Sequence, residues 1–401
     1  MTPPRTLADL ITPTPVSRFL GDSHGREHAL FRGGAAAFDP VLPWSALNDL
    51  LERNRLVPPR LRLVRGGADV DPAAYVDEVP LRDGGHARRL ITGALLGQLR
   101  EGATLVVDAV EELHGPVGAL AAALERDLRE QVQVNLYASW GTSHGFDVHW
   151  DNHDVLALQV AGRKNWRLYG PTRPFPLYRD VEAPPPPEGD PVAEYLLEAG
   201  DVLYLPRGHW HDVAALGTPS LHLTFGFAPA TGIDLAEWLV DRLRADERFR
   251  RDLPRFAAPE RRKELAETLY AAIGEYFDAE AVDRFLLEHD GNARLAPGIR
   301  LPWGATPEAL PPGDDAVARL LTTRAAVRRR PDGTVVLFAA GHQWVFAGAA
   351  EPVLTALAEG AGRTIADLAA LPGSTVDAAT VRALLAELTS AGLIVVEEAP
   401  S

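Results

Sequence analysis

The sequence predicts an α+β fold, in which an antiparallel β-barrel or sandwich is followed by a helical block and a small mixed C-terminal unit. Three observations lead to this prediction. Short β-type runs separated by Gly, Pro and Asp occupy positions 132–227, a texture typical of barrels and sandwiches. Apolar residues at helical spacing follow over 234–288. Short helices and a β-ribbon then fill 313–399, as in a winged-helix-like unit.

Composition restricts the class of protein. The 401 residues exceed one ordinary domain, and 46% hydrophobic with 24% charged residues is the balance of a soluble protein with a core. No apolar run approaches the ~18 residues of a membrane helix, and residues 1–10 lack the pattern of a secretory signal. The absence of cysteine excludes disulfides, thiolate metal sites and cysteine nucleophiles. We therefore expect a cytoplasmic protein without a membrane segment.

The elements expected before residue 232 are mostly short. Residues 44–51 are typical of a helix that begins near a serine cap, and residues 116–130 of an amphipathic helix. The four-proline run Pro184–Pro187 is most simply an exposed stiff loop. The expected strands include residues 61–64, 104–107, 132–137, 155–160, 165–169, 201–205 and 221–227.

The rest of the chain is expected to be helical first and mixed afterwards. Leu235, Leu239 and Leu243 open a run of apolar residues at helical spacing that continues to about residue 288. Helices of this type often pair across a subunit interface, and the Pro-rich residues 297–312 are typical of a linker. A helix should then precede strands at 326–329 and 334–338, helices at 352–359, 364–370 and 378–391, and a strand at 394–397.

Histidine is concentrated in the β-rich region, where six of the twelve lie between residues 144 and 222. In a strand, residues i and i+2 point to the same face, so His149 and Asp151 should project together. Some sixty residues later, a turn, a strand and a Pro-Gly bend lead to His209 and His211. Two histidines and one carboxylate that leave three positions open form the facial triad of non-haem Fe(II) oxygenases. The alternative is a strand-end histidine bonded to an aspartate, since a bare His-x-Asp recurs by chance.

Lysine is rare in this chain: Lys164 and Lys263 are the only two, and the other 38 basic residues are arginines. Lys164 lies fifteen residues after His149, on the strand expected to run back beside the ligand strand. A compact ammonium there can meet the distal carboxylate of a dicarboxylate cosubstrate as a point charge. Lys263, within a helical Arg-Arg-Lys-Glu run, is better explained as a solvated surface residue.

With these motifs the chain resembles a bacterial member of the JmjC-type ribosomal oxygenases, which are cupin-fold, 2-oxoglutarate-dependent protein hydroxylases. The resemblance implies a double-stranded β-helix barrel of the cupin/JmjC type in residues 1–232, with its core at 104–227. A helical dimerisation block (233–296) and a linker with a winged-helix-like domain (297–401) should follow. The resemblance rests on the segments Val134–Tyr137, Gly145–Asp151, Gln159–Tyr169 and Gly200–His211.

The resemblance also implies roles for individual residues. His149, Asp151 and His211 would be the iron ligands, with His211 favoured over His209, whose counterpart in the family is variable. Lys164 would bind the distal carboxylate of 2-oxoglutarate. Further cosubstrate contacts are expected from Asn135, Thr224 and His222, although His222 could equally be a core histidine. The candidates at the substrate mouth are Tyr137, Trp150, His144 and Ser220.

Two departures from the family pattern surround the substrate mouth. Trp150 stands where tyrosine is usual, and His144 where glutamine is expected. The implied reaction couples oxidative decarboxylation of 2-oxoglutarate to hydroxylation of an arginine or histidine side chain in a protein, of the ribosomal class. A net charge of −15 suits a basic protein or peptide partner. Residues 300–401 hold eight arginines, no lysine and eleven acidic residues, so direct DNA binding is not expected.

Three alternatives remain open at this stage. The same chemistry could act on a peptide natural product or a small molecule. The chain could be a non-redox metal-binding cupin, although those usually offer His-x-His with a later glutamate. A transcription factor led by the winged helix is a third class, which the charge count disfavours. Histone demethylation also occurs among JmjC relatives, but the sequence contains no recognisable chromatin-reading module.

Overall fold

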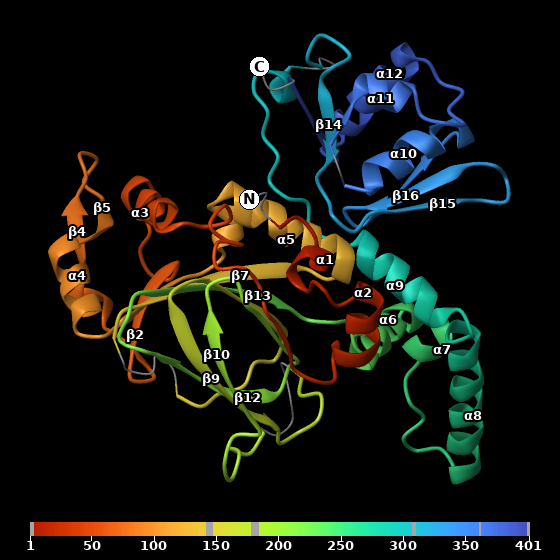
Figure 1. Ribbon diagram of the computed structural model, residues 1–401. Coiled ribbons are helices and arrows are strands. Elements are labelled where there is room, and N and C mark those ends of the chain that lie inside the picture. The colour runs from red at the N-terminus through yellow and green to blue at the C-terminus, as the bar shows by residue number, and fades with distance from the viewer. Residues whose placement is uncertain (1–3, 142–146, 178–183, 307–309, 361, 399–401) are drawn as a thin grey trace. The chain divides into compact units, whose positions relative to one another are not determined.

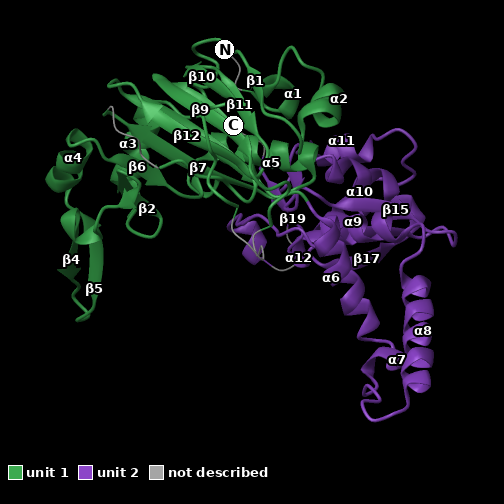
Figure 2. Ribbon diagram, turned by 90° about the horizontal axis from the view of Figure 1, so that it is seen from below, with its two compact units in different colours: residues 1–229 green, residues 230–401 purple. Residues whose placement is uncertain are grey.

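The computed structural model describes residues 4–398 except 142–146, 178–183, 307–309 and 361. Contacts divide the chain into two compact units, residues 1–229 and residues 230–401, which Figure 2 colours separately. Each unit is described here by itself. None of the helices in the described ranges is long and apolar enough to cross a membrane.

An eight-stranded antiparallel sheet forms the larger layer of the first unit, in the order β1-β11-β8-β13-β7-β6-β2-β3. The order shows that the central strands come from distant parts of the sequence, because β11 and β13 flank β8. The strands are β1 (Ala29–Phe31), β2 (Leu61–Arg65), β3 (Ala68–Asp69), β6 (Thr104–Val107), β7 (Val132–Ser139), β8 (Asp154–Ala161), β11 (Val202–Leu205) and β13 (Ser220–Phe227).

A three-stranded sheet, ordered β10-β9-β12, forms the second layer. Its strands are β9 (Arg163–Pro171), β10 (Ala193–Glu198) and β12 (His209–Ala215). Strand β8 is buried on both faces, and its side chains alternate between two cores as a period of two requires. Val155 and Ala157 pack with Trp166 and Leu168 of the smaller sheet. The intervening leucines of β8 join the larger core on the other side of the eight-stranded sheet.

Helices cover the outer side of the eight-stranded sheet (Figure 1), where α5 (Gly115–Leu128) packs on β7 and α1 (Leu7–Leu10) packs on α5. The hairpin of β4 (Val76–Pro80) and β5 (His86–Leu90) forms a separate two-stranded sheet. The other helices of this unit are α2 (Val16–Arg18), α3 (Trp44–Arg53) and α4 (Thr92–Arg100). All seven strands expected from the sequence in this unit are confirmed, whereas β1, β3, β10, β12 and the β4–β5 hairpin were not predicted.

The second unit begins with α6 (Gly232–Leu243), α7 (Glu247–Arg250), α8 (Pro259–Tyr276) and α9 (Ala281–Gly291). Two three-stranded sheets follow, β18-β14-β19 and β15-β16-β17. The elements are β14 (Val317–Leu320), β15 (Ala326–Arg329), β16 (Val335–Ala339), β17 (His342–Phe346), α10 (Glu351–Ala358), β18 (Arg363–Thr364), α11 (Ile365–Ala369), α12 (Ala378–Ser390) and β19 (Ile394–Glu397).

One expectation for this unit is wrong. A helix was expected ahead of β15, but the structure has the strand β14 there, paired with β18 and β19. Its residues alternate between half-buried and buried, with Ala318 and Leu320 inside, so the period of two prevails over the helical propensity of the flanking alanines. The assignment of this region as winged-helix-like stays a prediction.

Candidate metal centre

His149 and His211 face each other across an antiparallel bridge. The amide of His149 donates to the carbonyl of His211 at 3.0 Å, and the amide of His211 donates back at 2.8 Å. The two rings consequently lie close, with centroids 4.3 Å apart. Strand β12 also has an irregular register against β9 between Trp210 and His211, and such a bulge redirects the side chain that follows it.

Each histidine ring is fixed by a backbone carbonyl two residues earlier. Nδ1 of His149 lies 2.8 Å from the carbonyl oxygen of Asp147, and Nδ1 of His211 lies 3.0 Å from that of His209. A carbonyl can only accept, so each Nδ1 carries the hydrogen and each Nε2 presents its lone pair to the pocket. Burial lowers the pKa of His211, and electrostatic repulsion from the neighbouring His149 lowers it further. The ring therefore stays in the neutral form that binds metals.

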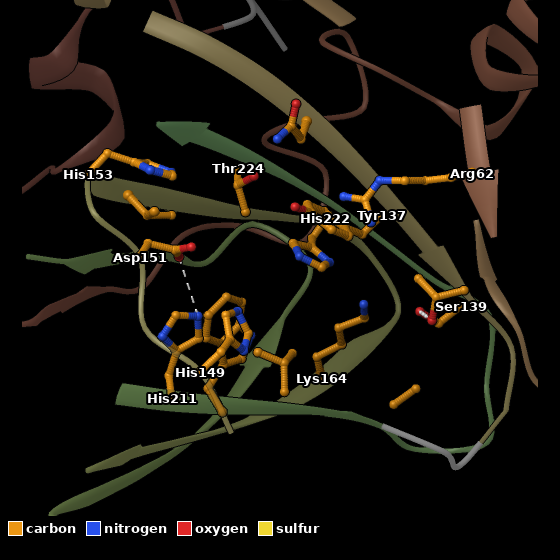
Figure 3. Close-up of a pocket in the computed structure, with 16 residues that line it drawn as sticks. Arg62, Tyr137, Ser139, His149, Asp151, His153, Lys164, His211, His222 and Thr224 are labelled. Carbon is orange, nitrogen blue, oxygen red and sulfur yellow. Dashed lines mark hydrogen bonds and ion pairs between the residues drawn. The ribbon is translucent and has the colours of Figure 1, made fainter. Parts of the chain in front are cut away.

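Asp151 completes the cluster. One oxygen of its carboxylate lies 3.7 Å from Nε2 of His211, the dashed line in Figure 3. Ligand atoms of His149, Asp151 and His211 all lie within 4.8 Å of one another, and no other such group of three occurs in the described ranges. The carbonyl of Asp151 accepts the amide of Gly208 at 2.8 Å, which ties this loop to the turn before β12. Two imidazole nitrogens and one carboxylate oxygen can therefore hold one cation.

The cluster opens into a pocket of about 270 Å³ between the two sheets. Lys164 reaches this space from β9 (Figure 3), where it pairs with Leu197 of β10 and Ala215 of β12. Its side chain is buried, and burial lowers the pKa of Lys164 to about 7. Within the described part of the chain, no carboxylate pairs with this ammonium. A buried, unpaired amine of this kind calls for an anionic ligand.

Aromatic and hydroxyl groups form the opposite wall. The rings of Tyr137 and His222 stack with centroids 4.8 Å apart and an interplanar angle of 9°. Burial raises the pKa of Tyr137 to about 12, against a hydrogen bond with Thr224 that lowers it, so the phenol stays protonated. Burial, and secondarily the charge of Lys164, lowers the pKa of His222 well below its usual value. The Asn135 side-chain carbonyl accepts the amide of Ala109 at 3.2 Å, which fixes its orientation.

Trp166 borders the metal cluster directly, since its indole stacks on the ring of His211 at 5.7 Å and 18°. Nε1 of Trp166 and Nδ1 of His222 are buried with no hydrogen-bond partner in the described structure. Both residues line the pocket together with Lys164. Two buried polar atoms without partners in the described structure thus border the same cavity as the Lys164 ammonium, the arrangement expected of a binding site for a polar ligand.

The structure brings together most of the site residues expected from the sequence. His149, Asp151, His211, Lys164, Asn135, Thr224, His222 and Tyr137 line the pocket. Trp150 and Ser220 do not line it, and the Ser220 hydroxyl instead accepts a hydrogen bond from the side chain of buried Gln159 at 2.9 Å. His144 lies outside the described residues. His209 is buried but belongs to neither the cluster nor the pocket lining.

Several lining residues were not anticipated: Arg62, Thr104, Ser139, His153 and Trp166. Trp166 could have been found, because it follows Lys164 by two residues on one strand and so shares its face. Thr104 and Ser139 bond to each other at 3.1 Å across β6 and β7, and Arg62 makes long ion pairs with Asp69 (3.4 Å) and Asp108 (3.5 Å). No local spacing links these three to the metal motif.

Comparisons with known proteins agree with this geometry. Residues 116–235 match the JmjC domain family. The chain is 29% identical over 297 residues to the bifunctional lysine-specific demethylase and histidyl-hydroxylase NO66 of Dictyostelium discoideum, covering 67% of this chain and 56% of that protein. It is 30% identical over 258 residues to ribosomal oxygenase 1 of Bos taurus, covering 61% and 37%. The chain spans roughly a fifth to just over half the length of the first curated relatives it matches.

Solved structures of YcfD, a ribosomal oxygenase from Escherichia coli, share the fold. One, in complex with cobalt and 2-oxoglutarate, has a TM-score of 0.59 at 21% identity, covering 96% of this chain and 99% of that one. Another has a TM-score of 0.61 at 21% identity, covering 96% and 98%. Together with the domain match, these likenesses confirm the predicted JmjC cupin fold.

Proposed function

We propose that this chain, which carries a JmjC domain, is an Fe(II)- and 2-oxoglutarate-dependent dioxygenase that hydroxylates a protein side chain. One observation carries the proposal: the buried ammonium of Lys164, which pairs with no carboxylate of the described residues, lines the same pocket as His149, Asp151 and His211. The three candidate metal ligands alone would suit many activities. Together with a buried cation across one small cavity, they suit a dicarboxylate that chelates the metal.

The residues fit a divalent iron ion. Two neutral imidazoles and one carboxylate are the donor set of the facial triad, which leaves positions for other ligands. Backbone carbonyls already hold both rings in the tautomer that offers Nε2. When bound, the metal with 2-oxoglutarate and O2 supplies the oxidising power of the reaction, with succinate and CO2 as the coproducts.

The residues also fit the cosubstrate. The Lys164 ammonium would pair with its distal carboxylate as a point charge, and the unpartnered indole N–H of Trp166 is a further donor on the same side of the cavity. Asn135, His222 and Thr224 would complete the contacts. The His222–Tyr137 stack would hold the wall against which the substrate side chain lies. Trp150, Ser220 and His144 stay predictions for the substrate mouth.

Turnover of 2-oxoglutarate tests the chemistry without a known substrate. Purified protein with Fe(II) should convert 2-oxoglutarate to succinate slowly alone and faster beside a cell lysate. His211→Ala and Lys164→Ala should each remove this conversion, whereas Tyr195→Phe, outside the pocket, should retain it. A wild-type protein that binds Fe(II) but never yields succinate would leave a non-redox metal-binding cupin as the better interpretation.

We propose a basic ribosomal protein as the substrate, hydroxylated on an arginine or histidine side chain. Relatives named ribosomal oxygenase and histidyl-hydroxylase support this choice, and so does the net charge of −15, which favours encounter with a cationic partner. Mass spectrometry should find a ribosomal protein that gains the mass of one oxygen atom only in cells that carry the chain. An unchanged pattern would instead favour a peptide natural product or a small molecule.

We also propose a cytoplasmic homodimer, divided into a catalytic domain (1–232), a helical dimerisation block (233–296) and a winged-helix-like domain (297–401). Helix α8 supports the dimer, because Ala272 is its one buried residue while Tyr270 is 81% exposed. A role in protein binding rather than DNA binding suits the last domain. Arg382, the only cation of α12, bonds to Asp314 at 3.0 Å, so this helix presents no basic face.

A further inference from the structure

A buried carboxylate lies just beyond the metal cluster and belongs to none of the roles above. Asp154 is the first residue of β8 and is 1% exposed. It accepts a hydrogen bond from the hydroxyl of Tyr204 and a second, at 3.0 Å, from the amide of Arg207. Tyr204 is fully buried, and its oxygen in turn accepts the amide of Gly25 at 2.7 Å.

This carboxylate stands at one end of a series of crosslinks between the two segments that supply the metal ligands. Asp154 binds the amide of Arg207, the carbonyl of Asp151 binds the amide of Gly208, and the backbones of His149 and His211 bind each other. The second and third links join backbone to backbone, so almost any side chains would permit them. Only the first link depends on a particular side chain.

The turn that these links hold has little freedom of its own. Gly208 has φ +80°, and a Cβ there would lie 2.6 Å from Cδ of Pro176. The turn leads within three residues to His211. Any shift of Arg207 relative to Asp154 is therefore passed to the position of His211 relative to Asp151.

We infer that Asp154 and Tyr204 form a positioning pair that sets the separation of Asp151 and His211 and so tunes the affinity of the site for its metal. The inference rests on the proposed metal site, but neither residue is a ligand. Tyr204 directs one oxygen of the carboxylate, which leaves the other aimed at the turn. A buried carboxylate is a costly way to fill a core, and its placement beside the ligand turn accounts for its presence.

Metal binding by the purified full-length protein tests the inference, with Co(II) as the probe and its visible absorption as the signal. Tyr204→Phe removes one hydroxyl, and the nearly isosteric Asp154→Asn keeps an oxygen for Arg207 but loses the negative charge. The matched control is Tyr195→Phe on β10, whose hydroxyl bonds to His28 outside the network. We expect the Kd for Co(II) to rise about tenfold or more in both test variants and to stay unchanged in the control.

Amide hydrogen exchange without metal separates positioning from general destabilisation. The amides of Gly208 and His211 should exchange faster in Tyr204→Phe, while those at the centres of β7 and β13 keep the wild-type rate. Equal acceleration everywhere, or a Co(II) Kd within twofold of wild type in both variants, would overturn the inference. If wild-type protein itself fails to bind Co(II), the proposed metal site fails first, and the two failures are thereby distinguished.

Discussion

The backbones of His149 and His211, 62 positions apart in the chain, exchange two hydrogen bonds as directly opposed residues. The three candidate ligands therefore come together only when these two backbone segments pair in this register. A slip of one residue would turn either side chain to the opposite face. The neighbouring Gly208–Asp151 bond and the irregular register before His211 both act on the same register.

The first prediction concerns the three ligands. His211→Ala or Asp151→Ala should weaken Co(II) binding by more than the ~10–100-fold that outer-shell partners contribute, because each removes a donor atom. Both should remain folded, since the backbone pairing does not need these side chains. Isothermal titration with Co(II) and circular dichroism provide the measurements. His209→Gln is the control: if it abolished binding while His211→Ala did not, the ligand assignment would be wrong.

The sequence was most informative where chemistry and local spacing coincide. The His-x-Asp pair, the segment ending at His211 and the rare Lys164 could each be recognised from local spacing, and the structure unites them in one pocket. The strand expected at His149–Asp151 is not formed, because His149 makes only an isolated bridge between β7 and β8. Arg62, Thr104 and Ser139 reach the pocket from strands β2, β6 and β7, whose order in the sheet is set by long-range pairing. No periodicity in the sequence encodes that order. Trp150 does not line the pocket, and its place at the substrate mouth stays a prediction.

A second prediction concerns the turn that leads into β9, the strand of Lys164. Gly162 has φ +67°, and a Cβ there would lie 2.1 Å from the carbonyl oxygen of Pro219. Gly170, near the other end of β9, has φ +74° with open space around it. Gly170→Ala should therefore lower the free energy of unfolding only by the strain of a left-handed alanine, roughly 1–2 kcal/mol. Gly162→Ala should lower it by roughly 1–3 kcal/mol more, because the new Cβ overpacks against Pro219.

Urea unfolding of both glycine variants provides the measurement. Equal free energies of unfolding for Gly162→Ala and Gly170→Ala would show that the Pro219 segment moves aside without cost. The close approach would then not fix the position of the β8–β9 turn.

A third prediction concerns the proposed dimer. Tyr270 is 81% exposed on α8 and Phe256 is 97% exposed just before it, and the proposed interface would cover both side chains. Tyr270→Asp and Phe256→Asp together should reduce the mass in solution from twice 43.3 kDa to 43.3 kDa, as measured by light scattering after size-exclusion chromatography. Phe175→Asp, at a 63% exposed site in the first unit, is the control and should leave the mass unchanged. A wild-type monomer would refute the dimer.

A fourth prediction is that Lys164 lowers the stability of the protein without its cosubstrate. The pKa of Lys164 is lowered from 10.5 to about 7 by burial, so the unfolded chain binds the proton more tightly. The resulting loss of stability is largest below pH 7 and declines as the pH rises from 7 toward 10.5. Lys164→Met should raise the free energy of unfolding by a few kcal/mol at pH 6, at about 1.4 kcal/mol per pKa unit, and by much less at pH 10.

Chemical unfolding at the two pH values measures this difference. Lys263→Met is the matched control, because the side chain of this second lysine is 79% exposed and should change stability little at either pH. A Lys164→Met variant less stable than wild type at pH 6 would show that the ammonium has a partner or solvent in the free pocket.

The fifth prediction applies the same pKa to cosubstrate binding. In the free pocket the Lys164 amine is charged below about pH 7 and neutral above it, whereas a bound dicarboxylate favours the charged form and raises this pKa. Binding above pH 7 must therefore take up a proton. The Kd for 2-oxoglutarate, measured by calorimetry without O2 and with Mn(II) in place of iron, should be constant from pH 6 to 7 and then rise up to about tenfold per pH unit.

Lys164→Arg should bind with no such rise, because a guanidinium stays charged throughout this range. The same rise in Lys164→Arg would assign the titration to another group, and a flat wild-type profile would mean that Lys164 does not hold the carboxylate.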